Sequence, residues 1–237
     1  MTVHMNKPVC VIVGADSSNA IAFTRRFWLA GYQIVLLTHK NEFTKDLVKE
    51  IDNTWIYVCD VTDVISVEQT FAAIRAEFGK IDTLIFNSGV GVWRTVEDVT
   101  LEEFEHSWRV NALGALLVSK QIVPDMKQNN YGNIIFISTI ASRHSSLKTA
   151  AFGPAKAAQK SLAESMARHL SPFGVHVATI IMDGVVDTLV SRQLMKNKPN
   201  DSFIQSTDLA EVVFDLTKQK QSTWSSEIEV RSFREVW

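Results

Sequence analysis

The sequence predicts an α/β fold in which a parallel sheet of about seven strands lies between two layers of helices. Short apolar runs rich in Val and Ile recur along the chain without alternating with polar residues, which is typical of strands buried on both faces. Longer segments with helical spacing separate these runs, and this alternation indicates parallel strands joined by crossover helices. The 237 residues, 46% of them apolar, are enough for one domain with a substantial core.

The strands and helices are expected in a regular order. The apolar runs predicted as strands are 9–13, 34–37, 55–58, 83–86, 134–137 and 175–181. The segments predicted as helices, because their apolar residues recur three and four positions apart, are 20–30, 66–78, 101–126 and 150–170. A helix near 208–218 and a strand near 227–230 complete the pattern. Because no linker, internal repeat or low-complexity tract interrupts it, we expect one domain over residues 1–237.

Composition excludes several classes of function. The 24 basic and 26 acidic residues give a net charge of -2 without a dense basic cluster, so no nucleic-acid partner is expected. No apolar run approaches the roughly 18 residues that cross a bilayer, and the polar first residues are unlike a secretory signal. Cys10 and Cys59 make neither a disulfide framework nor a metal-binding spacing. We therefore expect a cytoplasmic protein without a membrane segment or a metal site.

The first strand-to-helix turn is the first candidate binding element, because ligands of such sheets bind at the carboxyl ends of the strands. Gly14 directly follows the strand and permits a tight turn. The small or polar residues after it would let a phosphate approach the helix N-terminus. The candidate residues of this turn are Gly14, Asp16, Ser18, Asn19, Ala20 and Ile21. The alternative is an ordinary turn in which Ser18 or Asn19 caps the helix.

Further motifs follow in a fixed order. They are Cys59-Asp60-Val61, Asn87-Ser88-Gly89, Asn111, Ser138-Thr139, Lys156 and the segment 183–188. In order and spacing, the chain resembles the short-chain dehydrogenase/reductase superfamily over essentially its whole length. The resemblance implies a Rossmann-type doubly wound sheet, a nicotinamide dinucleotide cofactor and self-association as a dimer or tetramer through the helices after the fourth and fifth strands.

The resemblance also implies binding roles. Gly14, Ser18 and Ala20 fall where the family has a three-glycine phosphate loop, although only the first is glycine; alternatively, Ala20-Ile21-Ala22 matches the Ser-Ile-Ala form of bacterial enoyl reductases. Asp60 would accept a hydrogen bond from the adenine amino group with Val61 beside the ring, unless it is a helix N-cap. The remaining residues implied to border the cofactor are Asn87, Ser88, Gly89, Lys156, Gly184, Val186 and Thr188, the last through the nicotinamide carboxamide.

The end of the second strand bears on the choice of cofactor. An acidic residue there would bind the adenosine ribose hydroxyls and repel a 2′-phosphate. The sequence instead has Thr38-His39-Lys40, with no carboxylate until Glu42. A hydroxyl and cationic side chains suit the 2′-phosphate, so NADP is expected rather than NAD, unless Lys40 is only a solvated loop residue.

The expected catalytic group departs from the family at one position. Asn111, Thr139 and Lys156 match the family's asparagine, hydroxyl residue and lysine, but the position of the catalytic tyrosine is Phe152. None of the chain's three tyrosines lies near Lys156 in the sequence. A positioned general acid contributes about 10²–10⁴-fold, so a slow reductase is predicted. A proton from Thr139, from water bound to Lys156 or from His144, or an activated alkene as substrate, would each compensate.

Two readings of function follow from these residues. We expect an oxidoreductase of low or specialised activity that transfers hydride to or from a small, partly apolar carbonyl compound or alcohol. The alternative is a nucleotide-binding pseudoenzyme with a sensing or scaffold role. Phe152 and the loss of two of the three loop glycines favour it. A module that binds no nucleotide would leave Asp60 and Asn87 unexplained.

Overall fold

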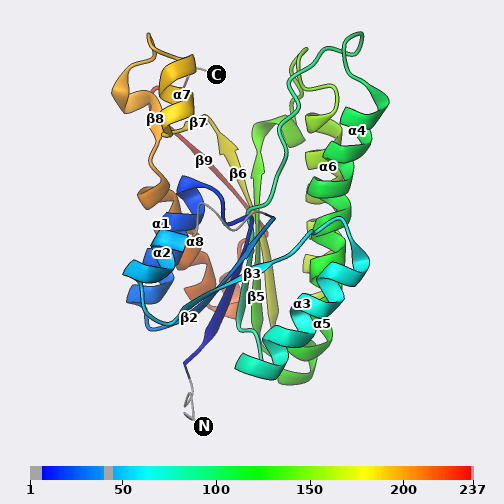
Figure 1. The fold of residues 1–237 in the computed structure, drawn as a ribbon, viewed down its shortest axis with the longest axis vertical. Helices are drawn as coiled ribbons and strands as arrows, with labels where there is room; N and C mark the ends of the chain where they lie inside the picture. Colours follow the sequence, from blue (N-terminus) through cyan, green and yellow to red (C-terminus); the bar gives the residue numbers. More distant parts are fainter. Residues whose placement is uncertain (1–6, 40–44, 236–237) are drawn as a thin grey trace.

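The main element of the protein is a seven-stranded sheet in the order β3-β2-β1-β4-β5-β6-β9, in which every pairing is parallel (Figure 1). The computed structural model describes residues 7–39 and 45–235. The strands are β1 (Val9–Val13), β2 (Gln33–Thr38), β3 (Thr54–Val58), β4 (Thr83–Phe86), β5 (Gly132–Thr139), β6 (Val175–Asp183) and β9 (Glu227–Arg231). The predicted parallel α/β sheet is therefore confirmed.

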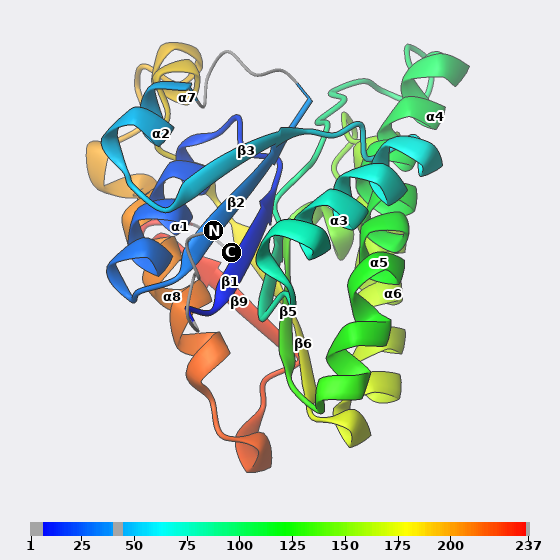
Figure 2. The ribbon, with the colours of Figure 1, turned by 60° about the horizontal axis from the view of Figure 1, so that its bottom comes forward.

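Helices cover both faces of this sheet (Figures 1 and 2). On one side lie α1 (Ser18–Leu29), α2 (Lys45–Glu50) and α8 (Ser206–Lys218). On the other side lie α3 (Val64–Phe78), α4 (Leu101–Trp108), α5 (Gly114–Asn129) and α6 (Phe152–Leu170). A small extension beyond the sheet holds β7 (Val185–Val186), α7 (Leu189–Leu194) and β8 (Phe203–Ile204).

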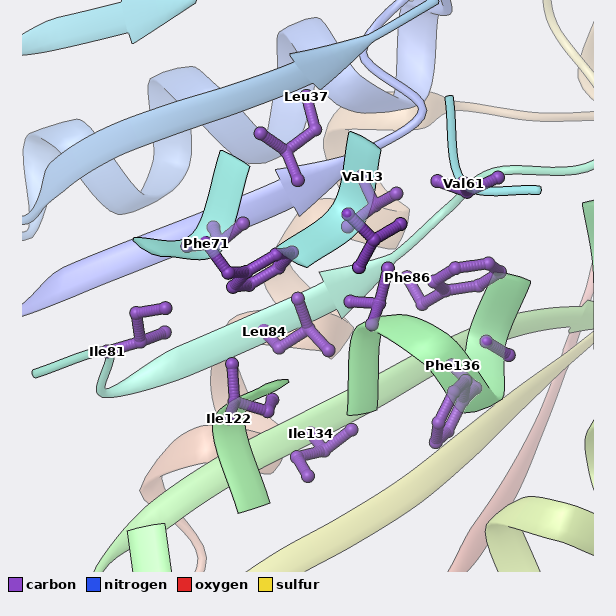
Figure 3. Packing of buried hydrophobic residues seen from close by; sticks show 14 of the residues in the cluster. Val13, Leu37, Val61, Phe71, Ile81, Leu84, Phe86, Ile122, Ile134 and Phe136 are labelled. Atoms are coloured by element: carbon purple, nitrogen blue, oxygen red, sulfur yellow. The ribbon is translucent and has the colours of Figure 1, made fainter. Parts of the chain in front are cut away.

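The core is divided into two halves by the sheet because successive strand residues point to opposite faces. Val11 and Val13 of β1 belong to the half that α3, α5 and α6 cover, while Cys10 and Ile12 belong to the half under α1 and α8. Figure 3 shows the first half, in which Phe71 lies among strand residues of β1, β2 and β4. Burial on both faces explains why the central strands read as continuous apolar runs.

The predicted helix over 101–126 is not one regular helix. It consists of α4, a π-helical turn over Arg109–Leu113, and α5. The Nδ2 of Asn111 donates to the carbonyl oxygen of Ser107, at 2.8 Å, so a side chain takes an acceptor four residues earlier. Wide turns of this kind are frequent at functional sites. The expectation of strands buried on both faces fails at the edges, where Val58 of β3 is 57% exposed.

The strand order reverses between β1 and β4, which is where doubly wound sheets bind ligands. The chain leaves β1 toward β2 and β3, then returns through α3 to β4 on the other side of β1.

Within residues 7–39 and 45–235, no helix combines the length and the apolar character needed to cross a membrane. Self-association stays a prediction: Ile122 is buried in the core and Leu116 is 39% exposed.

Candidate functional site

The loops after β1 and β4 are joined tightly at the point where the strand order reverses. Gly14 has φ +81°, and a Cβ there would lie 2.6 Å from the backbone of Ser88, so this approach requires glycine. The Nδ2 of Asn87 donates to the carbonyl oxygen of Gly14 and to the Oγ of Ser17, both at 2.9 Å. The two loops thus form one rigid floor at the carboxyl ends of the strands.

The N-terminus of α1 opens onto this floor. Ser17 caps the helix by accepting from the backbone N of Ala20 at 3.2 Å, so the alternative in which Ser18 or Asn19 is the cap is wrong. The Oδ1 of Asn19 instead accepts from the Oγ of Ser206 on α8 at 2.8 Å, and the Oγ of Ser18 lies 3.1 Å from the same hydroxyl oxygen. Ala20 is buried and Ile21 packs partly against the core under α1, so the first turn of the helix is fixed from behind.

A cleft of about 420 Å³ begins at this floor and extends beyond the ends of β2 and β3. Its polar lining includes Asp16, His39 and Asp60. The Oγ1 of Thr38, at the end of β2, donates to the Oδ2 of Asp16 at 2.6 Å. The Asp16 carboxylate, from the loop after β1, therefore lies at the end of β2, although β2 itself has no acidic residue there. Lys40 lies outside the described residues.

Asp60 holds its carboxylate in a fixed orientation at the edge of this cleft. Its Oδ1 accepts from the backbone N and the Oγ1 of Thr62, both at 2.8 Å. Burial raises the pKa of Asp60, but these hydrogen bonds and the charges of His39 and His106 outweigh it, so the pKa is lowered overall. The N-cap of α3 is Asp63, not Asp60, so the helix-cap alternative for Asp60 is wrong. Val61, 8% exposed, lines the same cleft.

A second cleft of about 210 Å³ continues from the first, with which it shares Ser17, Asn87 and Gly89. The other residues that line it are Asn19, Gly91, Ile137, Ser138, Thr139, Phe152, Lys156 and Met182. Thr139 ends β5, and Phe152 and Lys156 lie one helical turn apart at the start of α6. The structure thus gathers three of the four expected catalytic residues around one small cleft.

Lys156 is buried in the wall of this second cleft. Its Nζ donates to the carbonyl oxygen of Ile137 at 3.0 Å and to the Oε1 of Gln159 at 3.2 Å. Burial lowers the pKa of Lys156 to about 7. Asn111, fully buried in the π-helical turn, leaves its Oδ1 without a hydrogen-bond partner among the described residues. A Cβ added to Gly89 would lie 3.0 Å from this Oδ1 and 3.3 Å from the Lys156 Nζ, so both polar atoms flank the bare Gly89 backbone.

Phe152 lines the same cleft with a phenyl ring, which has no hydroxyl proton to donate. The ring of Trp93 lies 5.7 Å away, centroid to centroid, at an interplanar angle of 49°, and Trp93 is 62% exposed. No tyrosine replaces the missing phenol: the Tyr32 hydroxyl bonds Lys218, that of Tyr57 bonds Glu77, and Tyr131 lies at the opposite end of β5 from Thr139. His144 is exposed and does not line either cleft.

The segment after β6 contributes no side chain to the lining of either cleft. Gly184, Val186 and Thr188 do not line either of them. The Oγ1 of Thr188 caps α7 by accepting from the backbone N of Ser191 at 2.9 Å. The structure therefore does not bring these three expected residues to the remainder of the site.

Two features of the site were missed in the sequence. The contact between Asp16 and Thr38 joins residues of different elements, so no local pattern could reveal it. Gln159, by contrast, carried a signal: it is polar, three positions after Lys156, and therefore on the same face of the helix. Its side chain is fully buried.

Comparison with known proteins places the chain in a family. The profile of the family described as short chain dehydrogenase matches residues 8–199. Dehydrogenase/reductase SDR family member 7B of Xenopus laevis is 26% identical over an alignment of 198 residues that covers 79% of this chain and 61% of that relative. An uncharacterized oxidoreductase of Staphylococcus aureus is 25% identical over 233 residues, which are 98% of this chain and 99% of the relative.

Solved structures agree at the level of the fold. The closed form of serine dehydrogenase complexed with NADP+ has a TM-score of 0.89 at 22% identity, covering 97% of this chain and 96% of that one. NAD+-bound xylitol dehydrogenase has a TM-score of 0.86 at 24% identity, covering 97% and 99%. Because the family profile spans most of the sequence, from the loop before β1 to the end of the α7 region, the chain belongs to the short-chain dehydrogenase family.

Proposed function

We propose that this protein is an NADP-dependent oxidoreductase that reduces a small, partly apolar carbonyl compound or oxidises the corresponding alcohol. The observation that carries the proposal is the continuity of the two clefts at Ser17, Asn87 and Gly89. Asp60 lines one of the clefts, and the buried Lys156 lines the other. When bound, a nicotinamide dinucleotide would supply or accept the hydride.

The residues present fit such a cofactor. Gly14 and Ser17, just before α1, line the first cleft, and the backbone N–H groups and dipole at the N-terminus of α1 favour an anion such as a phosphate. Within the described part of the chain, the hydrogen bonds from Thr62 both go to the Oδ1 of Asp60, so its Oδ2 would serve as an acceptor for the adenine amino group. Asn87 would border the nicotinamide ribose, Lys156 would direct its remaining N–H into the second cleft, and Thr139 would donate to the substrate oxygen.

The substrate class follows from the second cleft. Besides its hydroxyl, amide and ammonium groups, the lining has apolar side chains: Ile137, Phe152 and Met182 line the cleft, and Trp93 packs against Phe152. Apolar lining with a few polar groups is typical of small-molecule sites. We therefore propose a substrate with one carbonyl or hydroxyl group on a partly apolar, flat body.

Titration with reduced dinucleotides tests this proposal directly. We expect NADPH and NADH to bind with dissociation constants below 1 mM. This limit corresponds to a binding free energy of about −4 kcal/mol, which is that of a weak specific site. The measurement is the change in nicotinamide fluorescence on binding. An Asp60→Asn variant serves as the control for the adenine end and should weaken both dinucleotides alike. If neither dinucleotide binds below millimolar concentration, the oxidoreductase proposal is wrong.

The preference for NADP should be opposed by Asp16. Its carboxylate, held against Thr38 at the end of β2, adds a negative charge near the place of a 2′-phosphate. Two exposed charges a few ångströms apart interact by about 1 kcal/mol, so Asp16→Asn should tighten NADPH binding roughly fivefold. The affinity for NADH should change less than twofold, roughly, because it lacks the charge. Equal changes for the two dinucleotides would show that Asp16 does not act on the 2′-phosphate.

A second candidate function is dinucleotide binding without turnover. Phe152 favours it, because the described residues around Lys156 include no phenol. Such a pseudoenzyme would bind the cofactor as above but would not gain carbonyl reduction when a phenol is restored. The Phe152 variant argued in the Discussion therefore separates the two candidates.

A further inference from the structure

The ammonium group of Lys156 is held only by neutral acceptors. Two of its three N–H donors are used, by the Ile137 carbonyl oxygen at 3.0 Å and by the Gln159 Oε1 at 3.2 Å. Among residues 7–39 and 45–235, Lys156 forms no ion pair with a carboxylate, and it is 4% exposed. Because Lys156 also lines the second cleft, its third N–H is left for whatever enters there.

Gln159 fixes the direction of this ammonium group. Its Nε2 donates to the backbone oxygen of Asn111 at 2.9 Å, while its Oε1 accepts from Lys156. The opposite orientation of the amide would turn its NH₂ group toward the ammonium and its oxygen toward a carbonyl, so the two contacts determine the orientation together. Gln159 thereby ties α6 to the π-helical turn and leaves the lysine little freedom.

Two buried polar atoms without a hydrogen-bond partner among the described residues belong to the surroundings of the second cleft. The Oδ1 of Asn111 and the Oγ of Ser138 are buried and have no hydrogen-bond partner among the described residues. Asn111 is 0% exposed and Ser138 is 1% exposed, so burial without a partner carries a penalty. Ser138 lines the second cleft together with Lys156 and Thr139. Because the Asn111 Oδ1 and the Lys156 Nζ both lie against Gly89, the unpartnered Oδ1 indicates that a polar ligand atom or a water belongs next to the ammonium.

We propose that Lys156 is itself the proton donor of this site, in place of the phenol absent at position 152, and that Gln159 is the positioning residue that keeps its third N–H directed at the cleft. The proposal rests on the proposed oxidoreductase function. In the reductive direction, hydride from the reduced nicotinamide forms a C–H bond as the carbonyl π bond breaks. The alkoxide oxygen then takes a proton from the Lys156 ammonium, whose N–H electron pair stays on nitrogen. Neutral Lys156 regains a proton from solvent.

The surroundings of Lys156 match this task. The groups that face it are neutral on every element packed against it: Gln159 from α6, Asn111 from the π-helical turn, Ile137 and Ser138 from β5, and Gly89 from the loop after β4. Burial is the cause that lowers its pKa to about 7. A general acid works best when its pKa is near the working pH. A carboxylate in place of the Gln159 amide would raise the pKa and hold the proton more tightly.

Titration of Lys156 tests the proposal without a known substrate. In protein labelled with ¹³C at the lysine ε-carbons, one lysine signal should titrate near pH 7, and it should be missing from Lys156→Arg. Gln159→Glu should move that midpoint up by about two units, because a carboxylate favours the charged form. Gln159→Met, which keeps the volume but removes the acceptor, should move it down by about one unit. Gln128→Met, an exposed substitution on α5, is the matched control and should leave it unchanged.

A pH profile with a probe substrate gives the second readout. Reduction of 4-nitrobenzaldehyde by NADPH should be lost as pH rises through the Lys156 midpoint, and the loss should occur at higher pH in Gln159→Glu. A lysine midpoint above about 9 in the parent protein, or no shift in either Gln159 variant, would overturn the inference even if NADPH binds. Absence of NADPH binding would instead overturn the proposed function and leave the lysine titration standing.

Discussion

Replacement of Phe152 by tyrosine is expected to raise kcat/KM for carbonyl reduction by two or more orders of magnitude, within the range of about 10²–10⁴ that a positioned general acid contributes. Phe152 lines the second cleft one helical turn before Lys156, so a phenol oxygen there would stand beside the ammonium and near Thr139. The positive charge would lower the pKa of the phenol and make it a better proton donor. The measurement is steady-state reduction of a panel of aldehydes, ketones and enones with NADPH.

Phe152→Leu is the matched control, because it removes the aromatic ring without adding a hydroxyl. It should leave carbonyl reduction at or below the parent level while the affinity for NADPH is retained. The gain in Phe152→Tyr should also be confined to carbonyl substrates, since an activated alkene can take its proton from water. If tyrosine gives no gain with any carbonyl compound while NADPH still binds, the protein is a dinucleotide-binding pseudoenzyme or uses a different chemistry.

The fold could be predicted from the sequence because its strands are buried. Runs such as 9–13 and 83–86 match β1 and β4 residue for residue, since no solvent-facing position interrupts them. The break in the predicted helix 101–126 could not be predicted, because a π-helical turn keeps nearly the same apolar spacing on either side. The short α2 and α7 were missed for a related reason: six residues are too few to show a helical period.

The candidate site was predictable only where a motif carried it. Lys156, Thr139 and Asp60 lie at fixed positions relative to strand ends, and the structure brings them to two joined clefts. The partners of these residues depend on tertiary contacts. Asp16 meets Thr38 across 22 positions, and Gln159 meets the backbone of Asn111 across 48. The negative charge of Asp16 at the end of β2, and the neutral hydrogen-bond acceptors of Lys156, therefore became evident only from the structure.

Lys156→Met is expected to stabilise the protein, most strongly at and below neutral pH. The folded state lowers the pKa of Lys156 from 10.5 to about 7 by burial. Between these two values the unfolded chain binds more protons than the folded one, so the stability of the parent rises with pH over that window. Below about pH 7 the full penalty is present, with an upper limit on the order of 5 kcal/mol. Above about pH 10.5 both states carry neutral lysine and the penalty vanishes.

Urea unfolding of the parent and of Lys156→Met at pH 6, 8 and 10 measures this difference. The variant should be the more stable at pH 6, and the gap between the two free energies of unfolding should narrow toward pH 10. Lys120→Met, at an exposed position on α5, is the control. Its free energy of unfolding should differ little from that of the parent, and this difference should not narrow from pH 6 to pH 10. A gap that is constant from pH 6 to pH 10 would mean that Lys156 keeps an ordinary pKa in the folded protein. A narrowing gap would show that the fold carries a destabilising buried cation, which packing alone does not require, so the reason for its presence must lie in the cleft that it lines.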